Sequence, residues 1–499
     1  MYTSLKSKEN RRRRSSGVFF CLAVLFLIAG CTLGPDFKRP APPSSRAYTY
    51  RVQPAATVRA DGLAQQFKTG AKIAADWWHL FKSPKIDAVI KEAVINSPSL
   101  QSAQAGLRQS REILRAGEGV FYPQVDADFS AARQKFSPSR FGGSAESSIF
   151  NLYTLTSTVS YALDVFGGQR RAVEGLGAQV DYQRYLVLGT YIALSGNIIN
   201  AMIARAAYRE EFDATVKLAA FQSEQVRITE AQAEAGTVPY SNVLSLQSQL
   251  AAILATLPPL KQKLVQANHL LAVLTGHEPS EWTPPDVSMA ELSLPGELPL
   301  SIPSNLVRQR PDILASEAQL HGASANIGVA TAAMFPSFTL SGSYGFESTS
   351  MGNLLKKTSS IWGLGADAAA PLFHGGTLSA QRRAAMEAYR QSMANYRQTV
   401  LNALEQVADT LWALEHDAEA LNAQSKALRA SKEALELIQA NYRAGTVNYL
   451  QVLVADNQYY QAKIGYLQAQ AGRLQDTVAL FVSLGGGWWN GKGKIPGVL

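Results

Sequence analysis

A heptad pattern dominates the C-terminal part of the chain. Between Thr377 and Tyr442 an apolar or aromatic residue recurs every seven positions: Val400, Val407, Leu414, Leu421, Leu428, Leu435 and Tyr442. A repeat of seven over this length is typical of a coiled-coil helix, and at ~1.5 Å per residue it predicts a rod of roughly 100 Å. A glycine-containing turn follows, and a second series then begins: Leu453, Tyr460, Leu467, Leu474 and Phe481. The pattern therefore predicts a long antiparallel helical hairpin.

The same hairpin is encoded a second time, earlier in the chain. The turn sequence Ala-Gly-Thr-Val occupies 235–238 and again 444–447, an offset of 209 residues. The helix after the first turn also carries residues at sevens: Val243, Leu250, Leu257, Leu264 and Leu271. Two further matches precede the long helices: Phe166-Gly167-Gly168 with Phe373-His374-Gly375-Gly376, and Tyr122-Pro123 with Phe335-Pro336. Because these features recur together, an internal duplication is predicted.

The first residues have the features of a signal peptide. Residues 1–30 hold six Lys and Arg against Glu9, a net charge of +5 out of +8 for the whole chain. The apolar run 18–29 that follows is shorter than the ~20 residues of a membrane-spanning helix. Since the remaining charge is only 8 − 5 = +3, the basic balance belongs mostly to this segment. We therefore expect no nucleic-acid partner.

The apolar run ends in Leu27-Ile28-Ala29-Gly30-Cys31. This sequence resembles the lipobox of bacterial lipoproteins, in which the cysteine is acylated and becomes the new N-terminus. The resemblance implies an anchor at Cys31 in the outer membrane, since Thr32 replaces the aspartate that retains lipoproteins in the inner membrane. The alternative is a plain signal peptide followed by a chance cysteine. With Cys21 removed and Cys31 acylated, no thiol remains for a disulfide, a metal or catalysis.

Four segments change to a period of two, which indicates strands with one apolar and one polar face. They lie at 125–131, 153–163, 338–346 and 362–368, and a polar loop is expected between the first two, at 135–151. Their lengths suit tilted membrane strands of ~9–11 residues, although a small soluble sheet is the alternative. Four strands cannot close a barrel, because the smallest bacterial barrels have about 8. The chain is therefore expected to share a barrel with copies of itself, and two, three or four copies in all are possible.

Six segments are predicted along the chain. They are a signal peptide at 1–30, a lipidated tether at 31–83, a first repeat at 84–276, a linker at 277–303, a second repeat at 304–484 and a C-terminal tail at 485–499. Each repeat should contain a helix, two strands and a long helical hairpin. The prolines of the tether favour an extended chain along the outside of the molecule. The glycine run of the tail predicts flexibility.

Two N-terminal sequences carry a family resemblance. Gly34-Pro35-Asp36-Phe37-Lys38-Arg39-Pro40 and Asp76-Trp77-Trp78-His79-Leu80-Phe81 resemble signatures of the outer-membrane factor family, the TolC-like efflux channels, in its lipoprotein branch. The resemblance implies a mainly α fold with a membrane β part, and a homotrimer whose strands form one barrel of about 12. It also implies a helical tunnel through the periplasm and a linker belt around it. A periplasmic adaptor (membrane fusion protein) and an inner-membrane pump would feed this passive duct.

The resemblance also implies a gate just after the second tip turn, where the family has a ring of aspartates. The matching residues here, Gln451 and Val454, are uncharged, and the nearest acid is Asp456, one turn further along. We therefore expect closure by apolar packing of Tyr442, Tyr449 and Val454. The alternative is that these aromatic residues only fill the core between the helices.

The tip turns themselves are the expected docking site for the adaptor, through Gly236-Thr237-Val238 and Gly445-Thr446-Val447. Two other functions stay open, namely the outer-membrane channel of a type I protein secretion system and a periplasmic coiled-coil tether without a channel.

No catalytic or cofactor-binding pattern is found in the sequence. The six histidines are scattered, and none is placed at metal-ligand spacing with a carboxylate. Gly486 to Lys492 has the spacing of a phosphate-binding loop, but Gly493 stands where Ser or Thr should bind Mg²⁺. The sequence therefore predicts neither an enzyme nor a cofactor.

Overall fold

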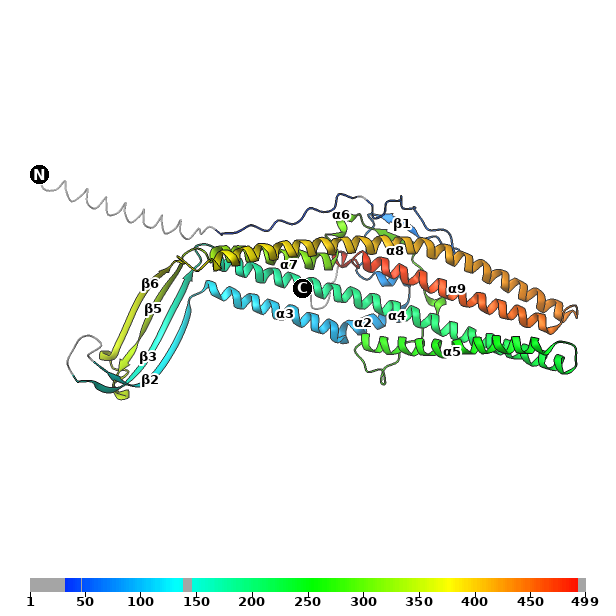
Figure 1. Cartoon of the computed structure of the whole chain (residues 1–499), viewed down its shortest axis with the longest axis horizontal. Coiled ribbons are helices and arrows are strands. Elements are labelled where there is room, and N and C mark those ends of the chain that lie inside the picture. Colours follow the sequence, from blue (N-terminus) through cyan, green and yellow to red (C-terminus); the bar gives the residue numbers. More distant parts are fainter. Residues whose placement is uncertain (1–31, 46, 138–145, 492–499) are drawn as a thin grey trace. The chain divides into compact units, whose positions relative to one another are not determined.

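The computed structural model describes residues 32–45, 47–137 and 146–491. Cys31 and the predicted signal peptide at 1–30 lie outside the described residues. The chain forms two compact units, and each unit combines pieces of both repeats (Figure 1). The first unit comprises Met1–Arg39, Arg108–Tyr182 and Ser316–Tyr396, and the second comprises Pro40–Leu107, Gln183–Ala315 and Arg397–Leu499.

The first unit contains one antiparallel sheet made by both repeats. Its strands are β2 (Gln124–Phe136), β3 (Ser148–Leu163), β5 (Ser337–Ser348) and β6 (Ser360–Ala369), in the order β2-β3-β5-β6. The pairing of β3 with β5, for example Leu163 opposite Phe338, joins the two repeats. The four predicted strands are thus confirmed.

The loop predicted at 135–151 is wrong at both ends. β2 continues to Phe136, β3 begins at Ser148, and Arg133 pairs with Asn151 in the ladder. The backbone ladder needs no alternation of side chains, because both faces of these strand ends are exposed. A polar run was therefore a poor signal for where the strands stop.

The long hairpins of the two repeats match in length. Helices α4 (Gly168–Glu234) and α8 (Thr377–Arg443) have 67 residues each, and their return helices α5 (Tyr240–Leu274) and α9 (Tyr449–Ser483) have 35 each. At ~1.5 Å per residue the longer pair measures roughly 100 Å. These equal lengths confirm the internal duplication.

Most heptad residues of the second hairpin are buried, as predicted, whereas of those on α5 only Val243 and Leu271 are buried. On α8, Val407, Leu414 and Leu421 are buried, and on α9, Leu467, Leu474 and Phe481 are buried. The shorter helices are α2 (Pro84–Asn96), α3 (Pro98–Glu118), α6 (Pro303–Leu306) and α7 (Pro311–Ala332). A break between α2 and α3 at Ser97 follows from the proline after it, which disfavours helix in the preceding residue.

The second unit contains a small belt that the sequence did not predict in detail. Strands β1 (Gln66–Thr69) and β4 (Glu297–Leu300) pair in parallel, which joins the tether to the linker. Trp77 in the short helix η1 (Trp77–Phe81) is buried and stacks on Phe481, with ring centroids 5.0 Å apart. The paired tryptophans thus act as packing anchors.

The expectation of a flexible tail is wrong for its described part. Gly485, Gly486 and Gly487 are buried and all have positive φ. A Cβ on Gly487 would lie 2.5 Å from the carbonyl oxygen of Ile73, so only glycine lets the chain pass this close. Asn490 then donates a hydrogen bond to the same oxygen at 2.9 Å. The glycine run therefore marks close packing rather than flexibility.

Candidate functional site

The sheet of the first unit has two open edges and exposed apolar side chains. Within the described residues β2 pairs only with β3, and β6 pairs only with β5. Phe129 on β2 and Trp362 and Leu364 on β6 are among the exposed residues. Unpaired strand edges with apolar side chains are costly in water, and this argues against the small soluble sheet. The sheet needs further strands beside it and an apolar medium around it.

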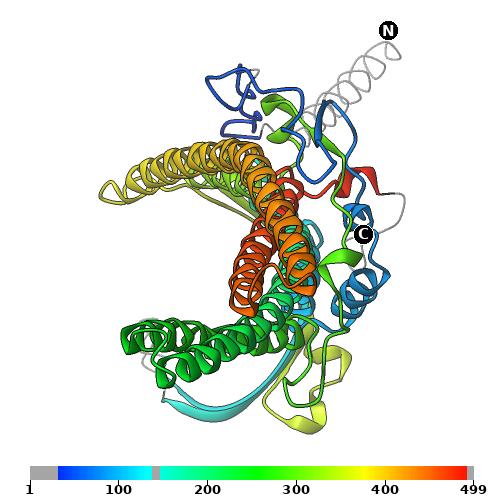
Figure 2. The same ribbon diagram turned by 90° about the vertical axis from the view of Figure 1, so that its right-hand side faces the viewer.

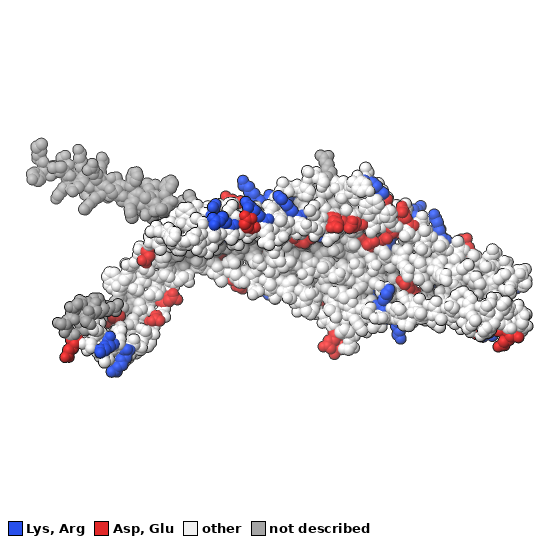
Figure 3. All heavy atoms as spheres, viewed as in Figure 1, with Lys and Arg blue, Asp and Glu red and all other residues white. Residues whose placement is uncertain are grey.

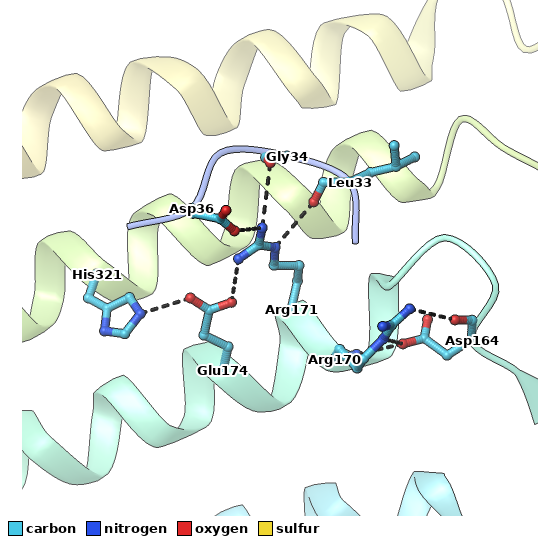
Figure 4. Close-up of polar contacts among 8 residues, drawn as sticks. All are labelled: Leu33, Gly34, Asp36, Asp164, Arg170, Arg171, Glu174 and His321. Carbon is cyan, nitrogen blue, oxygen red and sulfur yellow. Dashed lines mark hydrogen bonds and ion pairs between the residues drawn. The ribbon is translucent and has the colours of Figure 1, made fainter. Parts of the chain in front are cut away.

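A cluster of charged residues holds the tether against the start of α4 (Figure 4). Arg171 in the first turn of α4 is almost fully buried, and its guanidinium donates to Asp36 at 2.6 Å and to Glu174 at 2.7 Å. The same side chain donates to the carbonyl oxygen of Leu33 at 3.2 Å. Arg171 therefore binds backbone and side chain of the tether together. We call this cluster, with His321, the tether seat.

Helix α7 completes the tether seat from the second repeat. His321 contacts Glu174 at 2.8 Å, and its ring stacks on Phe37 of the tether with centroids 4.4 Å apart. Burial would raise the pKa of Glu174, but the hydrogen bonds from Arg171 and His321 and the charge of Arg171 hold it below its usual value. Glu174 is therefore a carboxylate at neutral pH, and it balances the buried guanidinium of Arg171.

Asp164 explains how two arginines are tolerated in the first turn of a helix. Basic side chains are unfavourable near a helix N-terminus, where the backbone carries partial positive charge. Asp164 accepts hydrogen bonds from the backbone N–H groups of Gln169 at 3.0 Å and Arg170 at 2.9 Å. It also accepts one from the Arg170 side chain at 3.1 Å. The arginine pair two residues after Gly167-Gly168 was the sequence signal for this site, and the sequence analysis did not single it out.

Replacing Gly34 with alanine is expected to release the tether from its seat. Gly34 has φ +90° and approaches Gly328 so closely that a Cβ would lie 2.4 Å from the Gly328 Cα. We expect a loss of ~2 kcal/mol or more in local stability, and so roughly a thirtyfold faster trypsin cleavage after Lys38. Limited proteolysis of the purified protein measures this rate.

Gly62→Ala is the matched control for this experiment. Gly62 has φ +84°, but a Cβ there meets no atom within 4 Å. It tests the backbone strain alone, without the clash. Equal cleavage rates after Lys38 in the Gly34 variant and the unchanged protein would contradict the importance of the close approach.

The two tip turns have the same geometry, as their sequences predict. In the first, Gly236 has φ +73° and the Thr237 N–H donates to the Gln232 carbonyl at 2.9 Å. In the second, Gly445 has φ +76° and the Thr446 N–H donates to the Asn441 carbonyl at 3.0 Å. Each is a left-handed glycine cap that ends a long helix. Figure 2 shows the hairpin ends α4–α5 and α8–α9 from the tip side.

The tip glycines and threonines are exposed, whereas Val238 and Val447 are half-buried. Gly236, Thr237, Gly445 and Thr446 therefore present more surface to another protein than the two valines do. The docking role of the turns stays a prediction.

The expected gate residues divide into a surface set and a buried one. Tyr442, Tyr449 and Val454 are partly exposed, and Gln451 is exposed. The ring centroids of the two tyrosines lie 5.4 Å apart. Asp456 differs, since it is only 6% exposed and burial raises its pKa. The gate role of all five residues stays a prediction.

Helices α8 and α9 also bring two carboxyl groups together. Burial, together with the hydrogen bond and charge of Asp476, raises the pKa of Asp417 from 3.8 to about 7. In the unfolded chain Asp417 loses its proton near pH 4, whereas in the folded protein it keeps the proton up to about pH 7. The folded state binds more protons between these values, so stability is greatest below this window and falls as the pH rises through it.

Asp417→Asn is therefore expected to raise the melting temperature at pH 8 and to change it little at pH 4. The amide removes the repulsion with Asp476 and does not titrate. Thermal unfolding in detergent at several pH values measures the effect. Glu433→Gln, which changes an exposed acid on the same helix, serves as the control. A constant difference between Asp417→Asn and the unchanged protein at all pH values would contradict the prediction.

The helices leave much uncharged surface. In Figure 3 large areas of the long helices show neither Lys and Arg nor Asp and Glu. On α5 the exposed apolar residues include Leu244, Leu254, Leu270 and Val273. Such a face is expected to be covered by another chain rather than by water.

Comparison with known proteins identifies the family. The family model described as "Outer membrane efflux protein" matches residues 89–277 and 302–486, one segment in each repeat. The probable efflux pump outer membrane protein TtgC of Pseudomonas putida is 27% identical over 358 residues, which cover 71% of this chain and 72% of that protein. The pyoverdine export outer membrane protein OpmQ of Pseudomonas aeruginosa is 29% identical over 341 residues, covering 65% of this chain and 70% of that protein.

Solved structures agree with this result. The outer-membrane channel OprN is 27% identical, with a TM-score of 0.79, and the comparison covers 92% of this chain and all of that one. The open-state channel MtrE of Neisseria gonorrhoeae is 25% identical, with a TM-score of 0.78 over 93% of this chain. The resemblance to TolC-like channels is thus confirmed, as are the fold and the outer-membrane location. This chain belongs to the family of outer membrane efflux proteins.

Proposed function

We propose that three copies of this protein form the exit duct of a tripartite efflux pump, through which small molecules pass passively across the periplasm and outer membrane. The open-edged sheet carries this proposal. The described residues of one copy contribute four strands with two unpaired edges, and an unpaired edge in lipid costs several kcal/mol for each backbone group. Three copies give a closed barrel of about 12 strands. The resemblance to TolC-like channels favours three copies over two or four.

The long helices also indicate that several copies share one tube, because a single copy leaves apolar surface uncovered. The apolar residues that α5 exposes, and Leu401 and Leu437 on α8, need cover that a single copy does not provide. Neighbouring copies would bury these faces and continue the tunnel inward from the membrane. A wide duct makes few specific contacts with its cargo, so selectivity and energy would come from an inner-membrane pump. An adaptor protein would join that pump to the tip turns.

The relatives favour small molecules over proteins as the cargo. Their names refer to toluene, antibiotics and pyoverdine. We infer that drugs or other small toxic solutes are the cargo of this chain.

We also infer that Cys31 carries a lipid anchor. Cys31 lies outside the described residues, but the chain just after it supports the idea. Leu33 donates its N–H to the Phe166 carbonyl at 3.1 Å, close after the end of β3. An anchor there would enter lipid beside the strands. Metabolic labelling with an alkyne fatty acid should mark the protein, and Cys31→Ser should abolish the label. Equal labelling of both would refute the anchor.

Conductance in a planar bilayer tests the duct itself. Purified oligomers should open discrete, long-lived ion-conducting pores, and native mass spectrometry should give three copies. A non-conducting protein would support the periplasmic coiled-coil tether instead. In cells, deletion should raise sensitivity to small toxic compounds, whereas a block in protein secretion alone would favour the type I system.

A further inference from the structure

Two aromatic residues meet where the two repeats join inside one copy. Phe166 follows β3 in the first repeat, and Phe335 precedes β5 in the second. Their ring centroids lie 4.9 Å apart at an angle of 34°. The β3–β5 ladder, in which Leu163 stands opposite Phe338, sets this contact. Aromatic pairs at such distances attract each other in addition to burying apolar area.

The duplication places a counterpart of each residue at the outer edges of the sheet. In sequence, Tyr122-Pro123 matches Phe335-Pro336, and Phe373-His374-Gly375-Gly376 matches Phe166-Gly167-Gly168. Phe373 is 88% exposed and Tyr122 is 69% exposed. Within the described residues neither has a ring partner. The inner pair is thus complete, whereas its outer counterparts are separate and open to solvent.

The backbone beside the inner pair is closely packed, whereas the backbone beside Tyr122 is open. Gly168 at the start of α4 lies so close to α7 that its Cβ would be 3.0 Å from the Ala332 Cβ. The counterpart of Ala332, by the same offset of 213 that relates Tyr122 to Phe335, is Gly119, directly after the end of α3. A Cβ on Gly119 meets no atom within 4 Å. The end of α3 therefore has free space where α7 has the start of a long helix.

We propose that Phe373 of each copy packs on Tyr122 of the next copy, so that the joint between copies repeats the Phe166–Phe335 joint within a copy. This inference rests on the closed ring of copies proposed above. In that ring β6 of one copy pairs with β2 of the next, as β3 pairs with β5 inside each copy. The start of α8 then fills the space beside Gly119. The partner is a second copy of this chain, and no other molecule is required.

Cysteine crosslinking tests the contact in the full-length protein. Membranes that contain the double variant Tyr122→Cys/Phe373→Cys are treated with a short bis-maleimide and analysed on a denaturing gel. We expect bands of two and three linked chains, because each copy would be linked to its neighbours. Each single variant should remain at the size of one chain. The double variant Phe166→Cys/Phe335→Cys is the matched control, since its crosslink forms within one chain and adds no chain to the band.

The outcomes separate this inference from the proposed oligomer. If the outer pair gives single chains only, while native mass spectrometry of the same sample gives three copies, the aromatic contact is wrong and the oligomer stands. If the mass corresponds to one copy, both are wrong.

A second measurement avoids dependence on the cysteine variants. Phe373→Ala should lower the temperature at which the oligomer separates in mild detergent. Leu355→Ala, which removes an exposed apolar side chain between β5 and β6, should leave that temperature unchanged. Equal separation temperatures for Phe373→Ala and the unchanged protein would overturn the contact.

Discussion

A tryptophan in place of Gly445 is expected to abolish efflux while the channel still assembles in the membrane. Gly445 has φ +76°, and a Cβ there meets no atom within 4 Å. A large side chain would therefore point away from the hairpin into free space, without an internal clash. The backbone strain of a left-handed non-glycine residue costs about 1 kcal/mol, too little to unfold a helix of this length. A complete loss of efflux would then report a blocked docking surface.

Gly445→Asn is the control that isolates the bulk of the side chain. Asparagine tolerates the left-handed conformation and is small, so this variant should keep most of the efflux. Sensitivity of a deletion strain to a toxic pump substrate, complemented with each variant, measures efflux. A membrane fraction on a native gel measures assembly. Normal efflux by an assembled Gly445→Trp protein would remove the tip turn from the docking surface.

The corresponding substitution at the first tip tests whether the adaptor docks on both turns. Gly236 has nearly the same φ and the same free space around it. If the adaptor contacts both hairpins, Gly236→Trp should also reduce efflux. A defect at only one tip would assign docking to that repeat.

The elements that local pattern determines could be predicted from the sequence. A period of seven keeps one stripe of a helix on its partner, and heptad residues such as Val407 on α8 and Leu474 on α9 are buried accordingly. The strands follow from the period of two. The tip turns follow from a glycine after the last heptad residue, since only glycine adopts positive φ without strain.

Contacts between distant segments could not be predicted in this way. Arg171 binds the tether 135 positions away in sequence, and no local pattern relates the two. Arg310 likewise donates to the Ser483 carbonyl at 2.8 Å and to Gln406 at 2.8 Å. Proline is favoured in the first turn of a helix, and this alone accounts for Pro311 at the start of α7. The structure adds that Arg310 joins three segments.

The differences between the two repeats could not be predicted from their similarity either. Asp164 and Arg171 belong to the first repeat, whereas the second repeat has Pro371 before its entry loop and Ala380 in the first turn of α8. The tether therefore has one seat rather than two. The duplication predicts the features that the two repeats share. The chain has a single tether, however, and the tether can bind at only one of the two equivalent helix starts.

The other large effect is expected at Arg473, which holds the tether to α9. Its side chain is 1% exposed and donates to Gln65 at 3.0 Å and to Thr57 at 3.2 Å. Gln65 is itself fully buried and donates to Thr477 at 3.1 Å. Burial lowers the pKa of Arg473, although the charges of Asp417 and Asp61 oppose that change. Arg473→Met keeps the volume but leaves the side-chain amide oxygen of Gln65 without this donor, and should cost about 2–4 kcal/mol in unfolding free energy.

A second substitution distinguishes a polar network from simple packing. Replacing both partners of a buried hydrogen bond by apolar groups of similar shape is often nearly neutral, because no polar atom then remains unsatisfied. Arg473→Met/Gln65→Leu should therefore recover part of the stability that Arg473→Met loses, and the coupling energy from the double-mutant cycle should be at least ~1 kcal/mol. Denaturant midpoints of the detergent-solubilised protein measure all three variants. Additive losses would mean that Arg473 and Gln65 stabilise the belt independently.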